Sequence, residues 1–174
     1  VDCVKTVETL EVNNANGDET QAITLEGGFK VPDNNSKAIG PGGSTDEGYD
    51  DSISVKATLR IEFVKGETSD GVVTYLLEKA KGNWEIVDNA VTIYDKSFDV
   101  SCYGIGSLAT MKQQDLDNKV ADDDYSFSIT TYYDEPVPEN DPMPLVGAGM
   151  ECYVEREASP WYFRFNNCKL GDYE

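Results

Sequence analysis

The sequence predicts an all-β fold, an antiparallel sandwich, barrel or β-prism of about nine or ten strands with at most one short helix. Three observations lead to this expectation. Apolar and polar residues alternate along several segments, these segments are rich in β-branched and aromatic residues, and turn-forming pairs such as Asn16-Gly17 and Asp70-Gly71 separate them. The length of 174 residues suits one domain, so we expect residues 1–174 to form a single secreted all-β domain.

The first strands are predicted at residues 4–12 and 21–31, where the alternation is weak. The clearest signal follows at residues 52–63. Every second residue from Ile53 to Phe63 is apolar, and each residue between them is polar or charged. Twelve residues without an error in this period-two pattern indicate a strand with one buried and one exposed face.

The middle of the chain continues the pattern. Alternation predicts strands at residues 72–77 and 84–94, with a turn at residues 81–83 between them, and a weaker strand at residues 98–103. The one plausible helix covers residues 108–120, where apolar positions are sparse.

The last third carries three more predicted strands, at residues 125–133, 150–155 and 161–166. Two segments interrupt the strands and are expected to be long exposed loops. Residues 32–51 are rich in Gly, Ser, Asn and acidic residues, and residues 135–149 contain four of the seven prolines.

The charge balance excludes several classes of function. The chain has 33 acidic and 14 basic residues and no His, so its formal net charge is -19. This excess of negative charge repels phosphate backbones and anionic headgroups, so we expect neither nucleic acid nor an anionic membrane surface as a partner. Without His, the chain lacks Ser-His-Asp and Cys-His catalysis and imidazole metal ligands. We therefore expect a protein without enzymatic activity.

Four cysteines indicate an oxidising compartment, since they are even in number, widely spaced and free of any Cys-x-x-Cys pair. The four residues expected to form two disulfide bonds, with a connectivity that the spacing leaves open, are Cys3, Cys102, Cys152 and Cys168. Asn34 begins an Asn-x-Ser glycosylation sequon, and the chain starts at Val1 as a processed product would. We expect a secreted or extracellular protein, or one in an organelle lumen.

One part of the sequence resembles a known family. Residues 73–109 contain a strand, a Gly-Asn-Trp turn, a second strand and an aromatic-rich segment that ends at Cys102, and Ser159-Pro160-Trp161 follows later. This pattern, with Cys3 at the start of the first strand, resembles the luminal domain of the vacuolar proton-pump accessory subunit, which is similar to domains of lysosome-associated membrane proteins. The resemblance implies a β-prism around an apolar interior, in which some relatives hold a sterol, and it implies no catalysis.

Aromatic residues on the predicted strands are the candidate binding residues. Those expected to stack on a hydrophobic small molecule are Trp84, Tyr125, Phe127, Trp161 and Phe163. Arg164, Asn166 or tyrosine hydroxyl groups would orient the polar end of that molecule. The expected ligand is a carotenoid or another pigment, a sterol or another lipid, and no other cofactor and no metal are predicted.

Two alternative functions stay open. A protein-interaction module would use one sheet face, with Tyr132 and Tyr162 as exposed aromatic contacts to a protein partner or a second copy of the chain. An acid-rich calcium binder would use loop carboxylates at residues 46–51, 122–124 and 135–141, although none of these clusters has the spacing of a helix-loop-helix calcium loop.

Overall fold

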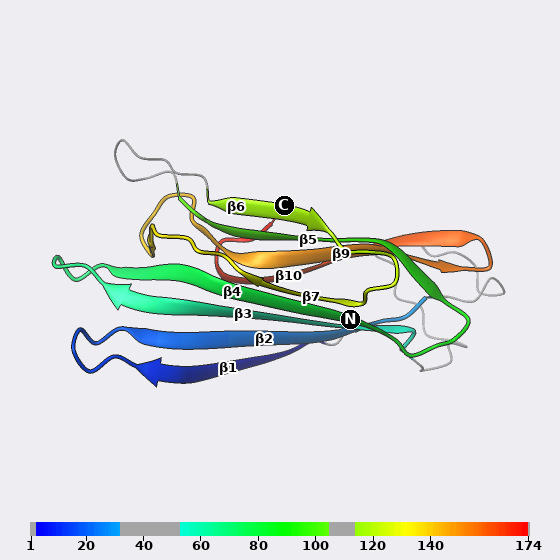
Figure 1. Ribbon diagram of the computed structural model, residues 1–174, viewed down its shortest axis with the longest axis horizontal. Coiled ribbons are helices and arrows are strands. Elements are labelled where there is room, and N and C mark those ends of the chain that lie inside the picture. Colours follow the sequence, from blue (N-terminus) through cyan, green and yellow to red (C-terminus); the bar gives the residue numbers. More distant parts are fainter. Residues whose placement is uncertain (1–2, 32–52, 105–113, 174) are drawn as a thin grey trace.

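The computed structural model describes residues 3–31, 53–104 and 114–173. These residues form ten β-strands in two antiparallel sheets, which confirms the all-β class (Figure 1). Among the three architectures that the sequence leaves open, the observed one is the sandwich, since the two sheets stack as separate layers. The described ranges contain no helix, and hence none that could cross a membrane.

The first sheet has the strand order β1-β2-β3-β4-β7, and a short strand, β8, also pairs with β4. Its strands are β1 (Cys3–Val12), β2 (Glu19–Phe29), β3 (Val55–Glu67), β4 (Val73–Ile86), β7 (Ser126–Thr130) and β8 (Val137–Pro138). Gly17 and Gly71 lie in the β1–β2 and β3–β4 connections with φ of 80° and 82°. This left-handed conformation suits glycine, so both predicted turns are confirmed.

The second sheet has the order β10-β9-β5-β6. Its strands are β5 (Thr92–Tyr103), β6 (Asp115–Lys119), β9 (Leu145–Arg156) and β10 (Ser159–Leu170). The chain crosses from the first sheet to the second between β4 and β5, returns between β6 and β7, and crosses again between β8 and β9. Residues far apart in sequence therefore meet on each sheet face.

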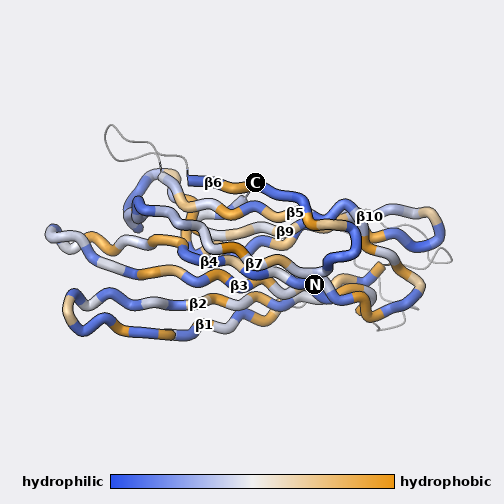
Figure 2. Tube along the Cα trace, in the orientation of Figure 1, coloured by the Kyte–Doolittle hydropathy of each residue, from blue (hydrophilic) through white to orange (hydrophobic). Residues whose placement is uncertain are grey.

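One apolar core lies between the sheets, built from alternate residues of the facing strands. On β3 the inward residues from Val55 to Phe63 are at most 1 % exposed, and on β9 the inward residues run from Val146 to Val154. Figure 2 shows hydrophobic and hydrophilic residues interspersed along the strands of both sheets. The half-buried strand predicted at residues 52–63 is thereby confirmed over residues 55–63, and it continues to Glu67.

The turn predicted at residues 81–83 is wrong, because β4 runs without interruption through Gly82. Gly82 pairs with Phe127 of β7, and a Cβ added at Gly82 would lie 2.1 Å from Cε1 of that ring. The glycine leaves room for an aromatic side chain rather than for a turn. The strand predicted at residues 84–94 is accordingly divided between the end of β4 and the start of β5.

A predicted helix and a predicted loop both contain observed strands. Within the predicted helix 108–120, Asp115–Lys119 form β6, an exposed edge strand, and residues 105–113 lie outside the described ranges. The predicted loop 135–149 contains β8 and the first residues of β9, which are buried. The predicted loop 32–51 and Asn34 within it lie outside the described residues.

The two expected disulfides are absent, since all four cysteines are free thiols. Cys102 on β5 lies opposite Val146, six residues along β9 from Cys152, which is about 20 Å along a strand. Cys168 points to the outer face of β10, and Cys3 lies on the edge strand of the other sheet. A disulfide needs Cα atoms within about 7 Å, so the strand register keeps Cys102 and Cys152 apart.

Candidate functional site

Two of the residues expected to bind a ligand, Trp84 and Phe127, pack on each other in the core. Trp84 is 3 % exposed, and the two ring centroids lie 6.0 Å apart. Phe127 also stacks on Phe98 of the opposite sheet, with centroids 4.1 Å apart and ring planes within 4° of parallel. The stacked Phe98 and Phe127 rings thus belong to opposite sheets and help to join them, although Phe127 remains partly exposed.

Trp161 and Phe163 lie elsewhere, on the inner face of β10, where both are partly exposed. The Phe163 ring lies 4.7 Å from that of Phe29 on β2, and Phe165 meets Phe29 edge-on at 5.9 Å. The buried Nε1 of Trp161 has no hydrogen-bond partner among the described residues. A buried donor without an acceptor costs about 1–3 kcal/mol, so this N–H has unused capacity to bind.

The ring of Tyr125 contacts the ammonium group of a buried lysine, Lys96. The Nζ of Lys96 lies 4.6 Å from the centroid of the Tyr125 ring and donates a 2.9 Å hydrogen bond to the backbone oxygen of Asp122. Lys96 sits at an irregularity of β5, opposite Cys152, and is almost fully buried. The Tyr125 ring therefore stabilises an ammonium group through a cation–π contact.

Arg164 does not join the aromatic residues. Neighbouring residues of a strand face opposite sides of the sheet, and Phe163 and Phe165 face the core. Arg164 consequently points to the outer face of β10, away from Trp161 and Phe163, and its role in orienting a ligand stays a prediction. The six predicted ligand contacts thus fall into four separate places, and Trp161 and Phe163 share one of them, on the inner face of β10, where both are partly exposed.

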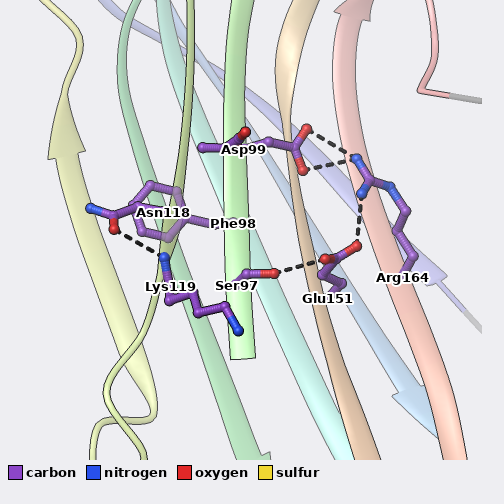
Figure 3. A pocket seen from close by; sticks show the side chains of 8 residues that line it. Ser97, Phe98, Asp99, Asn118, Lys119, Glu151 and Arg164 are labelled. Carbon is purple, nitrogen blue, oxygen red and sulfur yellow. Dashed lines mark hydrogen bonds and ion pairs between the residues drawn. The ribbon is translucent and has the colours of Figure 1, made fainter. Parts of the chain in front are cut away.

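An open pocket of about 610 Å³ lies on the outer face of the second sheet, around Arg164 (Figure 3). Nη2 of Arg164 donates to both carboxylate oxygens of Asp99 on β5, at 2.8 and 3.0 Å, and Nη1 donates to Glu151 on β9 at 3.0 Å. That bond from Arg164 goes to Oε2 of Glu151, and the hydroxyl of Ser97 donates to Oε1 at 2.8 Å. Lys119 and Asp117 of β6 complete the rim.

Gly149 makes this arrangement possible. It lies on β9 between Asp99 of β5 and Asn166 of β10. A Cβ on Gly149 would lie 2.7 Å from Nη2 of Arg164 and 2.8 Å from Oδ1 of Asp99. The missing side chain therefore lets the guanidinium group and the carboxylate meet directly above the middle strand.

The two carboxylates that bind Arg164 have pKa values that move in opposite directions. Burial raises the pKa of Asp99 and outweighs the contacts with Arg164. The hydrogen bond from Tyr162 is the largest cause that lowers the pKa of Glu151, and Ser97 and Arg164 act in the same direction. Because it accepts from these three groups, Glu151 is the more strongly stabilised anion of the pair.

A row of three tyrosines continues from the pocket along the same outer face. Tyr94 of β5 stacks on Tyr153 of β9 at 5.6 Å, and Tyr153 contacts Tyr162 of β10 at 5.5 Å. Tyr162 is 51 % exposed and donates its hydroxyl to Glu151 at 2.5 Å. Glu151 lies two residues along β9 from the direct partner of Tyr162, so the Tyr162 ring must lean along the sheet.

The structure places the residues of the alternative functions as follows. Tyr132 is exposed but follows β7 of the first sheet, so it does not share a face with Tyr162. No group of three potential metal ligands occurs within the described ranges, which include the acidic residues at 122–124 and 135–141. The acidic residues at 46–51 lie outside those ranges.

Comparison of the chain with protein-family models, with curated proteins and with solved structures finds no match. The resemblance to the luminal domains of the proton-pump accessory subunit and of lysosome-associated membrane proteins therefore stays a prediction.

Sequence reasoning missed most of the outer pocket. It named Arg164, but not Ser97, Asp99, Glu151 or Lys119. Each of these occupies an ordinary polar position of an alternating strand, and the sequence has 33 acidic residues from which to choose. The strand order β10-β9-β5-β6 selects them, and local patterns do not encode that order.

Proposed function

We propose that this protein is a non-enzymatic binding protein that carries an apolar small molecule, such as a carotenoid, a sterol or another lipid. The binding residues are Trp161 and Phe163, next to Phe29. The observation that carries the proposal is the Nε1 of Trp161, a buried donor without an acceptor in the described part of the chain. A ligand with one carbonyl or hydroxyl oxygen would supply the acceptor, while aromatic rings contact its apolar body.

Two further features support a carrier. The formal net charge of -19 gives the surface a hydration shell and mutual repulsion, which keep a protein with an insoluble cargo in solution. The aromatic contacts come from both sheets, since Phe29 belongs to β2 and Phe163 to β10. Secretion also stays a prediction, and the free thiols remove one of its supports.

The first test is the protein from its native source. We expect an absorption band or a lipid extractable with organic solvent, in a stoichiometric amount. A colourless preparation without extractable lipid would contradict the proposal.

The second test uses the two tryptophans of the chain as matched probes. A stearic acid with a nitroxide label quenches tryptophan fluorescence over short distances. We expect it to quench the Trp84→Phe variant, which retains Trp161, and to leave the emission of Trp161→Phe, which retains the core residue Trp84, nearly unchanged. Unlabelled sterol, which does not absorb the tryptophan emission, should reverse the quenching. Equal quenching of both variants, with unfolding curves like that of the wild type, would place the ligand elsewhere.

A further inference from the structure

The outer face of the second sheet carries a second kind of binding surface, separate from the inner-face residues Trp161 and Phe163. Its polar groups hold one another in place. Arg164 makes four hydrogen bonds, to Asp99, Glu151 and Asn166. Glu151 also accepts from Ser97 and Tyr162. Side chains fixed in this way lose little conformational entropy when a ligand binds.

The charges of the pocket disfavour an anionic ligand. Arg164 is neutralised by two carboxylates, and Lys119 is paired with Asp95 at 2.8 Å. Asp117, also on the rim, makes no ion pair among the described residues. The chain as a whole has a net charge of -19, which adds repulsion of phosphate and carboxylate groups.

The pocket also disfavours a wholly apolar ligand, because covering its polar groups without replacing their contacts with water costs free energy. A carboxylate has about four lone-pair sites and a guanidinium group five N–H donors, so both keep capacity beyond the bonds described. Hydroxyl groups donate and accept, and so they match a rim that offers both kinds of partner.

An aromatic ring completes the surface. The Tyr162 ring leans along the sheet and is half exposed, and its hydroxyl touches the same Glu151 that faces the pocket. A ring in this position covers the C–H face of a flat, partly apolar ring while neighbouring polar groups bind its hydroxyls. The pocket volume of about 610 Å³ falls within the range of small-molecule sites.

We propose that the outer face formed by Tyr162, Glu151, Arg164, Asp99 and Ser97 binds a neutral saccharide. The sugar ring packs on Tyr162, and its hydroxyls bind Glu151, Asp99 and the remaining N–H of Arg164. This site lies on the opposite side of the sheet from the apolar site, so either can be absent without the other.

The test is a titration with neutral sugars: glucose, galactose, mannose, fucose, xylose, N-acetylglucosamine and their oligomers. Saturation-transfer NMR and calorimetry detect binding at millimolar concentration. We expect at least one to bind, and Tyr162→Ala to weaken it about tenfold through loss of the ring contact. Glu151→Gln should weaken it as well, and it serves as the second variant if Tyr162→Ala does not fold. The control is Tyr132→Asn, an exposed tyrosine of the first sheet, which should bind as the wild type does.

The sugar can be free or attached to a protein. A glycoprotein that carries the same sugar should bind if its glycan is accessible, and enzymatic removal of the glycan should abolish that binding. The proposal is overturned if no neutral sugar binds, if folded Tyr162→Ala and Glu151→Gln bind as the wild type does, or if acidic sugars bind more tightly than neutral ones. Binding of the glycoprotein that survives loss of its glycan would instead identify a protein partner.

Discussion

The side-chain amide of Asn167 on β10 donates a 2.7 Å hydrogen bond to the backbone oxygen of Leu59 on β3, 108 residues earlier in the chain. The same Nδ2 donates at 2.9 Å to the backbone oxygen of Ile23 on β2. Asn167 is 2 % exposed, so a buried polar side chain of the second sheet bonds to two strands of the first. Buried hydrogen bonds of this kind fix how two sheets sit on each other.

We predict that Asn167→Leu destabilises the fold by about 2–3 kcal/mol, because two buried carbonyl oxygens lose a donor. Urea unfolding followed by circular dichroism measures the change. The matched control is Asn166→Leu on the outer face, which we expect to cost less than about 1 kcal/mol. Equal effects of the two substitutions would mean that the bridge between the sheets contributes nothing specific.

Gly82 and Phe127 should be energetically coupled. Gly82→Ala places a Cβ 2.1 Å from the Phe127 ring, and the short strand β7 must shift to accommodate it. We predict a loss of about 1–3 kcal/mol, the usual effect of overpacking. Combining it with Phe127→Leu, which replaces the ring by a smaller aliphatic side chain, should cost less than the sum of the two single changes. A double-mutant cycle measures this, and simple additivity would contradict the contact.

The sequence predicted the parts of the fold in which burial alternates along the chain. β3 buries every second residue, so its pattern is visible in the sequence, and the turns at Gly17 and Gly71 indicate the β1–β2 and β3–β4 hairpins. β6 is exposed on both faces, so it had no period to detect and was predicted as a helix. A turn is predicted at Gly82 because the sequence around it does not show the contact that requires a glycine there. That contact is with the ring of Phe127, on a strand 45 residues later.

The candidate site was less predictable than the fold for the same reason. The sequence predicts that aromatic residues on strands gather around one ligand, but pairing of β4 with β7 places Trp84 against Phe127, apart from Trp161 and Phe163 of β10. Arg164 was named, yet its partners Asp99 and Glu151 depend on which strands are neighbours. Composition cannot supply that information, because it describes residues and not their register.

The two carboxylates that pair with Arg164 should each make the free energy of unfolding depend on pH. Glu151 has a lowered pKa in the folded state, mainly through the hydrogen bond from Tyr162, so its contribution is present above the ordinary value of 4.5 and is lost as the pH falls through the folded pKa. The stability difference between the wild type and Glu151→Gln should therefore shrink as the pH falls below 4.5 and through the folded pKa.

The pKa of Asp99 is shifted in the opposite direction to that of Glu151. Burial raises its pKa, so the contribution of its titration is present below the ordinary value of 3.8 and is lost as the pH rises through the folded pKa. The stability difference between the wild type and Asp99→Asn should change with pH in the direction opposite to that for Glu151→Gln. Urea unfolding between about pH 3 and pH 7 tests both, and parallel pH profiles would contradict the assignment.

The thiols offer a direct check of the strand register. Burial raises the pKa of Cys102 to about 11 and those of Cys152 and Cys168 to about 12. Cys102 and Cys152 are also shielded from reagents in the core, whereas Cys168 is half-buried. Cys3 on the edge strand is exposed. Because the thiolate is the reactive form, we predict that a thiol reagent at about pH 8 modifies Cys3 rapidly in the folded protein and the other three only after unfolding.

Mass spectrometry of the labelled protein measures this reactivity. The expected result is one modified thiol per folded chain, four after denaturation without reductant, and none in folded Cys3→Ser. A non-reduced mass lower by four hydrogen atoms would instead reveal two disulfides, as cysteine spacing alone suggests. A Cys102–Cys152 bond would require one of the two residues to leave its core position, since their places along β9 are about 20 Å apart. Finding that bond would therefore contradict the β5–β9 pairing on which the outer-face pocket depends.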